Sequence, residues 1–224
     1  MTWLSANWPQ VVSLTIDHLL LSLPAILVSI LVAVPIGRLA WRRPRLGRPV
    51  LVAAMLMYAI PALPLLIVIP AIFNVPLRSE ATMIIALSIY GTALLASTAA
   101  DAFTSVDSRV REAAIAIGHS RMGMFWRVDL PLAFPVLLSG IRVMTVSTIS
   151  LVTIGALIGV PGLGMLLTDG FQRGIGAEVA TGIIATVALA LIADGLLLLL
   201  GRAVTPWSRA RHRPVATRKL EVTA

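Results

Sequence analysis

The 224-residue chain contains no cysteine and few charged residues for its length. The lack of cysteine excludes a disulfide framework and a thiolate metal site. Its three histidines, His18, His119 and His212, lack metal-ligand spacing, so we expect no metal site. The sequence also lacks a nucleophile–base constellation and a Walker motif. We therefore expect neither an enzyme nor a chain that binds ATP or another cofactor itself.

Charged residues make up 12% of the chain and hydrophobic residues 58%. A soluble domain carries about a quarter charged residues. The excess of apolar residues lies in runs whose length is close to the ~20 residues that a helix needs to cross a membrane. Barrel strands would alternate apolar and polar residues, and these runs do not. The sequence predicts an all-α polytopic membrane protein with one transmembrane domain, 18–203. Its five spans are expected at about 18–40, 49–73, 80–103, 130–158 and 178–201.

The net charge of +8 comes from arginines that gather in alternate connections. Basic clusters follow the first, third and fifth runs, at 38–48, 109–127 and 202–219, whereas the other connections hold only Arg78 and Arg173. The positive-inside rule then places the N-terminus outside and the C-terminus in the cytoplasm. Residues 1–17 are predicted to form an extracytoplasmic segment, and 204–224 a basic cytoplasmic tail. Because this topology explains the basic charge, no nucleic-acid partner is expected.

Two predicted membrane segments contain residues that interrupt helices. Pro61, Pro64 and Pro70 lie within the second run, so this segment should be kinked or locally unwound. Irregular backbone at membrane depth is tolerated where it lines a cavity or is buried in protein. A role in a translocation pathway and a kink that serves only packing both remain open. Residues 155–164 contain four glycines and Pro161, which predicts a re-entrant or outward-facing loop, followed by a polar connection at 169–178.

Residues 104–129 form the longest polar segment between the runs, and their pattern predicts two short amphipathic helices. Thr104, Asp107 or Ser108 can cap the first helix, and Gly118 can end it in a left-handed conformation. Ser120 can cap the second. Periodicity alone leaves open whether this is an interfacial helix without a partner or a surface for a cytoplasmic partner.

The run Glu112-Ala-Ala-Ile-Ala-Ile-Gly118, followed by Leu130-Pro131 and Gly140-Ile-Arg142, resembles the EAA motif of the permease subunits of ABC importers. The resemblance implies the five-helix fold of type I importers, as in methionine-importer permeases, and a bacterial inner-membrane location. It also implies partners: an ABC ATPase dimer that binds the loop, a second permease chain, identical or paralogous, and an extracytoplasmic substrate-binding protein. The loop residues implied to couple to the ATPase are Arg111, Glu112, Ala113, Ala114, Ile117, Gly118 and Arg121.

Other stretches are similar to permeases for the osmoprotectants glycine betaine, choline and carnitine. These are Ile60-Pro-Ala-Leu-Pro-Leu-Leu66, Gly155-Ala-Leu-Ile-Gly159 and Ile192-Ala-Asp-Gly195. This resemblance implies uptake of a quaternary-ammonium solute, with permeases for methionine or another amino acid as the nearest alternative. A secondary transporter would predict inverted repeats, and an intramembrane enzyme would need catalytic groups at membrane depth; the sequence offers neither.

The candidate pathway residues are Tyr58, Pro61, Pro64, Tyr90, Gly155 and Gly159. The two tyrosines are included because aromatic rings attract quaternary ammonium groups.

Arg142 and Asp194 are the ionisable residues well inside predicted spans. Charged groups at this depth are costly, so they usually find partners and face protein or water. Both lie nearer the cytoplasmic end of their spans, and we expect them to pair. A structural pair, a gating role and contact with substrate all remain open.

Overall fold

The computed structural model describes residues 2–206, and this part of the chain contains helices and no strand. The predicted tail lies outside the described residues from residue 207 onward. The elements in order are α1 Thr2–Arg42, α2 Pro44–Ala59, α3 Ala62–Phe73, α4 Glu80–Thr104, α5 Ser108–Ala116, α6 Arg121–Met124, a π-helical turn η1 Phe125–Asp129, α7 Leu130–Val152, a 3-10 helix η2 Thr153–Ile158, α8 Gly164–Arg173 and α9 Gly176–Val204.

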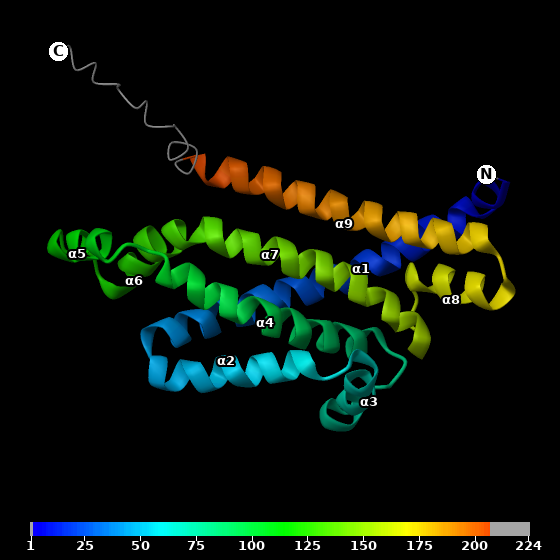
Figure 1. Cartoon of the computed structure of the whole chain (residues 1–224), viewed down its shortest axis with the longest axis horizontal. Coiled ribbons are helices and arrows are strands. Elements are labelled where there is room, and N and C mark those ends of the chain that lie inside the picture. The colour runs from blue at the N-terminus through cyan, green and yellow to red at the C-terminus, as the bar shows by residue number, and fades with distance from the viewer. Residues whose placement is uncertain (1, 207–224) are drawn as a thin grey trace, which may run out of the picture.

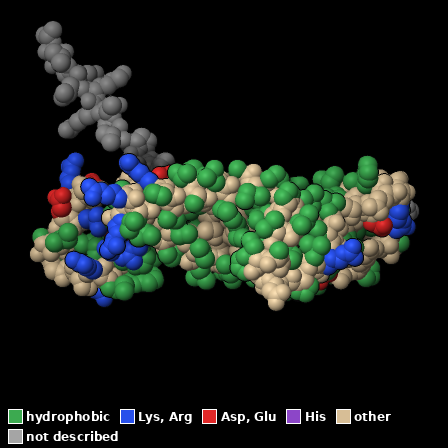
Figure 2. Space-filling model, turned by 90° about the horizontal axis from the view of Figure 1, so that it is seen from below, with side chains coloured by type: hydrophobic (Ala, Val, Ile, Leu, Met, Phe, Trp, Pro, Cys, Tyr) green, Lys and Arg blue, Asp and Glu red, His purple; other side chains and the backbone are tan. Residues whose placement is uncertain are grey.

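The long helices lie side by side in an elongated bundle (Figure 1). Among residues 2–206, four helical stretches are long and apolar enough to span a membrane, and the bent pair α2–α3 would make a fifth. α1 packs along α4, α4 packs against α7, and α7 packs against α9. Figure 2 shows a broad apolar surface along the middle, with most visible Lys and Arg side chains gathered at the end where α5 and α6 lie. We call this the loop end of the bundle.

The first helix differs from its predicted bounds. α1 begins at Thr2 and continues to Arg42, so residues 2–17 do not form a separate segment. The reason lies in packing, because Val11 and Leu14 share one helical face and contact Leu163 and Leu166. α1 is kinked at Asn7, whose backbone is not helical. The longer part, residues 8–42, is about 50 Å long at ~1.5 Å per residue, so it exceeds the thickness of a ~30 Å hydrocarbon core.

The predicted kink in the second run is confirmed as a break between α2 and α3, whose axes meet at 112°. Ile60 and Pro61 have extended backbone conformations, and Pro61 caps the start of α3. In a continuous helix the carbonyl of Ile60 would accept from residue 64, but Pro64 has no N–H. The Tyr90 hydroxyl donates to the Ile60 carbonyl instead. The break is thus stabilised by a side chain from α4.

The glycine-rich stretch after α7 leaves the regular helix, as predicted. η2 ends at Gly159, whose φ of 81° lies in the left-handed region. The predicted polar connection at 169–178 is wrong in part, because α8 continues through Arg173 before the chain turns at Gly174. α8 packs against α9, and Gly170 approaches the backbone of Val179 closely enough that a Cβ would lie 3.0 Å from its nitrogen.

A buried histidine joins three segments at the end of the bundle opposite the loop end. His18 of α1 is fully buried. Its Nε2 lies 2.9 Å from the carbonyl oxygen of Ile149 in α7, and its Nδ1 accepts from the backbone N–H of Leu163 at 3.3 Å. Because Nδ1 accepts, Nε2 must carry the proton and donate to Ile149. The neutral imidazole therefore holds α1, α7 and the start of α8 together.

The close packing of α1 on α4 depends on Gly37, which leads to a testable prediction. A Cβ at Gly37 would lie 2.5 Å from the Cβ of Ala99 and 2.7 Å from the nitrogen of Ala100. Gly37→Ala should therefore lower the yield of folded protein and its thermal unfolding temperature in detergent. Gly195→Ala in α9 is the matched control, since no atom of residues 2–206 lies within 4 Å of the added Cβ. The control should be neutral or slightly stabilising, and equal behaviour of both variants would contradict the packing argument.

Candidate functional site

The polar loop between α4 and α7 is built from strong local signals. Asp107 caps α5, and its Oδ1 accepts from the N–H of Arg109 at 2.9 Å. Gly118, with a φ of 88°, ends the helix. The N–H groups of Gly118 and His119 then bond to the carbonyls of Ile115 and Ala114, as in a Schellman motif. Ser120 caps α6, accepting from Gly123 at 3.1 Å. The predicted second helix, the cap at Ser120 and the end at Gly118 are confirmed.

The inner side of this loop is held against the bundle by an ion pair. Arg111 donates from Nε to Oδ1 of Asp129 at 2.8 Å, and the Asp129 side chain is only 1% exposed. The Arg111 guanidinium also lies 4.3 Å from the centre of the Trp41 ring in α1. The resemblance implied an ATPase contact for Arg111, but the structure turns its side chain inward. Arg111 therefore connects α5 both to η1 and to α1.

Aromatic side chains extend this connection into the bundle. Trp41 stacks on Phe103 of α4 with the ring centres 6.1 Å apart, and Phe103 lies 6.2 Å from Phe125 of η1. The guanidinium of Arg38 in α1 covers the Phe125 ring at 3.6 Å, a favourable cation–π arrangement. We call Arg38, Trp41, Phe103, Arg111, Phe125 and Asp129 the inner network. Sequence reasoning assigned no role in the loop to Arg38, Phe103, Phe125 or Asp129, because their partners are distant in the sequence.

The outer side of the loop exposes small and apolar groups next to charged ones. Glu112, Ala113, Gly118 and Arg121 are exposed, and Ile117 is 78% exposed. A hollow of about 500 Å³ lies where α5 joins α6, beside Ile117 and Gly118. Ala114 differs from the other predicted coupling residues because it is buried against Met124 and Val128. It shapes the packing of α5 on η1 and lies away from the outer surface.

The structure also brings together Arg142 and Asp194, as expected. Arg142 donates from Nε to Oδ1 and from Nη2 to Oδ2, each at 2.7 Å. The two side chains are 32% and 28% exposed. This two-point geometry joins the middle of α7 to α9 and is the stronger form of an arginine–carboxylate pair.

The six candidate pathway residues lie in two separate places. Tyr58 and Tyr90 meet edge to face at 5.8 Å beside the α2–α3 break, where Pro61 and Pro64 are exposed. Gly155 is buried close to Met83 of α4, and Gly159 lies on an exposed turn near Arg78. Tyr90 is largely buried and its hydroxyl is bonded to Ile60. The pathway role of these six residues stays a prediction.

With this geometry established, the chain can be compared with known proteins. A model of the family described as "Binding-protein-dependent transport system inner membrane component" matches residues 25–206, which is most of the chain. The chain belongs to this family. The inner-membrane location and the transport role predicted from the EAA-like loop are thereby confirmed.

Curated relatives of this inner-membrane component match over most of their length. This chain is 32% identical over 206 residues to the osmoprotectant import permease protein OsmW of Salmonella typhimurium. The match covers 89% of this chain and 94% of the relative. The chain is 29% identical to the glycine betaine/carnitine/choline transport system permease protein OpuCD of Bacillus subtilis, covering 92% and 89%. The choline transport system permease protein OpuBD of Bacillus subtilis is also 29% identical, with 94% and 92% covered.

Solved structures of ABC transporters share the fold of this permease-family chain. An inward-facing structure of the MetNI methionine ABC transporter gives a TM-score of 0.77 at 21% identity, covering 87% of this chain and 96% of that chain. An amino acid ABC transporter with histidines gives a TM-score of 0.69 at 18% identity, covering 92% and 97%. The predicted fold class, that of type I ABC-importer permeases, is confirmed.

Proposed function

We propose that this chain is the permease subunit of an ATP-driven importer for a small quaternary-ammonium osmoprotectant of the glycine betaine, choline or carnitine type. The relatives OsmW, OpuCD and OpuBD are permeases for solutes of this class, which supports the proposal. In the proposed complex an ATPase dimer supplies the energy, so the permease binds no nucleotide or other cofactor. A second permease chain, identical or paralogous, completes the pathway, and an extracytoplasmic binding protein delivers the solute.

The proposed orientation places the loop end in the cytoplasm and the start of α1 outside. The gathering of basic side chains at the loop end supports it.

The observation that carries the function is the two-sided loop. Its outer side offers Glu112, Ala113 and Ile117 to a partner, while its inner side is anchored to the bundle by Arg111 and Asp129.

This arrangement suggests how ATP-driven motion would reach the membrane. ATP binding closes the ATPase dimer and displaces α5 and α6. The displacement passes along η1 directly into α7, and through Arg111 and Trp41 into α1. The cavity between the permease chains then opens outward to receive the solute, and hydrolysis resets it.

The direct test reconstitutes the chain in proteoliposomes with the ATPase and the binding protein that co-purify with it. Labelled glycine betaine uptake should require ATP and the binding protein, and unlabelled choline or carnitine should compete better than methionine. Uptake without ATP would contradict an ABC importer. Competition by methionine alone would assign the chain to amino-acid import instead.

The docking surface makes a separate prediction. Ile117→Asp should reduce co-purification of the ATPase strongly, because it places a charge on the 78% exposed apolar residue beside the loop hollow. Phe171→Asp in α8 is the matched control: Phe171 is 82% exposed but lies near the opposite end. The control should retain the ATPase. Equal retention by both variants would show that the partner does not bind at Ile117.

A further inference from the structure

An open groove of about 600 Å³ lies between α7 and α9, and its walls are mostly apolar in area but include an ion pair and several hydroxyl groups. Its polar residues are Ser139, Arg142, Ser147, Ser150, Thr186 and Asp194. On α7, Ser139, Val143, Ser147 and Ser150 recur at three- and four-residue intervals, so they share one helical face. On α9, Thr186, Ala190 and Asp194 recur every fourth residue. Each helix thus turns one stripe toward the groove.

The Arg142–Asp194 pair lies near the middle of this groove. Arg142 is the thirteenth residue of the 23-residue α7, about 18 Å from its start at ~1.5 Å per residue. Ser139 lies toward the loop end of the pair, and Ser147 and Ser150 lie toward the opposite end. Ser150 is exposed and Ser147 is half-buried. The hydroxyls of Ser139 and Thr186 donate to carbonyls of their own helices. The hydroxyls that can serve the groove are therefore those of Ser147 and Ser150, on the side of the pair away from the loop end.

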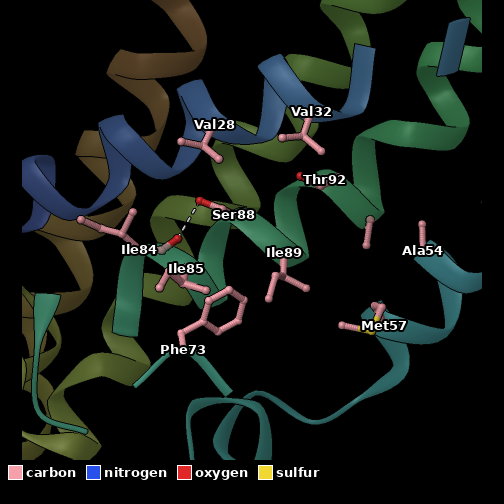
Figure 3. A pocket seen from close by; sticks show the side chains of 11 residues that line it. Val28, Val32, Ala54, Met57, Phe73, Ile84, Ile85, Ser88, Ile89 and Thr92 are labelled. Carbon is pink, nitrogen blue, oxygen red and sulfur yellow. Dashed lines mark hydrogen bonds between the residues drawn. The ribbon is translucent and has the colours of Figure 1, made fainter. Parts of the chain in front are cut away.

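A second cavity shows what an apolar site in the same bundle looks like. This cavity of about 480 Å³ lies between α1, α2, α3 and α4, where Val28, Phe73, Ile85 and Ile89 present only carbon (Figure 3). The hydroxyl of Ser88 there donates to the carbonyl of Ile84 at 2.7 Å and is satisfied within its own helix. Such a surface suits lipid chains. An ion pair about a third exposed does not, because charged groups facing hydrocarbon are costly.

The chemistry of the pair indicates which ligand would fit. Arg142 uses Nε and Nη2 toward Asp194, and within residues 2–206 no acceptor is found for its Nη1. That N–H group can donate to a carboxylate without breaking the pair. Each Asp194 oxygen accepts one bond from Arg142 and keeps a lone pair that can face a cation. The hydroxyls of Ser147 and Ser150 can bind water beside the pair. A small solute with both a carboxylate and a quaternary ammonium group is complementary to this arrangement.

We propose that the α7–α9 groove is a wall of the translocation pathway, and that the Arg142–Asp194 pair contacts the two charged ends of a zwitterionic solute as it passes. This inference rests on the proposed import function and deepens it. It assigns to the groove a preference for zwitterions of the glycine betaine or carnitine type over choline, which has no carboxylate.

The natural lack of cysteine allows a direct test in the complete transporter reconstituted in lipid. Ser147→Cys and Ser150→Cys place thiols in the groove, and Val28→Cys and Thr92→Cys place them in the apolar cavity as matched controls. The probe is a membrane-impermeant methanethiosulfonate that carries a quaternary ammonium group. The groove thiols should react, glycine betaine should slow their reaction several-fold, and the control thiols should stay unmodified.

Three outcomes would overturn the inference. The groove thiols could remain unmodified in the bilayer while reacting fully after denaturation, which would mean that lipid or protein covers the groove. They could cross-link to a second copy of the chain, which would make the groove a permease–permease contact. They could also react at the same rate with and without glycine betaine, so that water but no solute occupies the groove.

Arg142→Lys provides a second measurement with a readout beyond folding. Lysine keeps the charge but loses the forked donor geometry. The half-saturating concentration for glycine betaine should rise several-fold while that for choline stays unchanged, and equal shifts for both would contradict the assigned carboxylate contact.

Complete loss of ATP-dependent uptake in the unmodified transporter would refute the proposed function itself. Unreactive groove thiols in a transporter that imports normally would refute only the groove.

Discussion

Asp129→Asn is expected to uncouple transport from ATP hydrolysis. The asparagine keeps the size of the side chain but removes the charge that holds Arg111 at 2.8 Å and that also attracts Arg38. The Asp129 carboxylate is buried, and its Oδ2 has no hydrogen bond among the described residues, so the pairing with arginine is its main compensation. Without the carboxylate charge, Arg111 loses the ion pair that ties α5 to η1 and keeps only its contact with Trp41. Solute uptake per ATP hydrolysed should therefore fall several-fold.

The control for this variant is Asp101→Asn. Asp101 lies nearby at the end of α4, is exposed, and has no ion-pair partner within residues 2–206. It should transport like the unmodified chain. Both uptake and ATPase activity must be measured on the same reconstituted complexes, since a simple loss of folded protein lowers them together. Normal coupling in Asp129→Asn would show that the inner network does not carry the motion.

Asp194→Ala should have the second large effect, because it leaves the Arg142 guanidinium unpaired in the middle of α7. The yield of folded, membrane-inserted protein is expected to fall several-fold, because a charge is left unpaired at membrane depth although about a third of its side chain is exposed. Fluorescence-detected size-exclusion chromatography of the detergent-extracted protein measures this yield directly. The reversed pair, Arg142→Asp with Asp194→Arg, should restore much of the yield, because the opposite charges still face each other between α7 and α9.

The same double variant separates folding from transport. If the pair also contacts the solute, zwitterion uptake should stay low after the yield recovers, since the two charges are exchanged. Arg173→Ala serves as the matched control. It removes an ion pair with Asp169 in which the two side chains are 60% and 44% exposed, and such surface pairs contribute little to stability. A reversed pair that folds no better than Asp194→Ala would contradict the pairing as a structural requirement.

The features that could be predicted from the sequence are those with short-range signals. The prolines of the second run predict the break at Pro61, and Gly118 and Ser120 predict the ends of the loop helices. The depth of Arg142 and Asp194 in apolar runs predicts their contact, because an unpaired charge there is costly. In each case one residue type forces a local choice of backbone or partner.

The features that could not be predicted depend on contacts between distant segments. The helical state of residues 2–17 rests on packing of Val11 and Leu14 against Leu163 and Leu166. Arg111 lies in a motif expected to face a partner, yet Asp129 and Trp41 draw its side chain inward. Periodicity cannot reveal such a choice, because either side of α5 offers polar and apolar positions. α8 was missed because glycines at both of its ends resemble a continuous loop.

The continuity of α6, η1 and α7 has a mechanical consequence. Together they form one helical rod from Arg121 to Val152, and His18 fixes this rod near its far end at Ile149. Ile149 lies 28 residues from Arg121 but only 7 from Arg142. When this segment tilts as one body about Ile149, Arg142 moves about a quarter as far as Arg121, since displacement grows with distance along the helix. Pro135 and the π-helical turn at Phe125–Asp129 lie between the two arginines and are the points where the segment can bend. A stroke of several ångströms at the loop therefore becomes a shift of about one ångström or less at the ion pair.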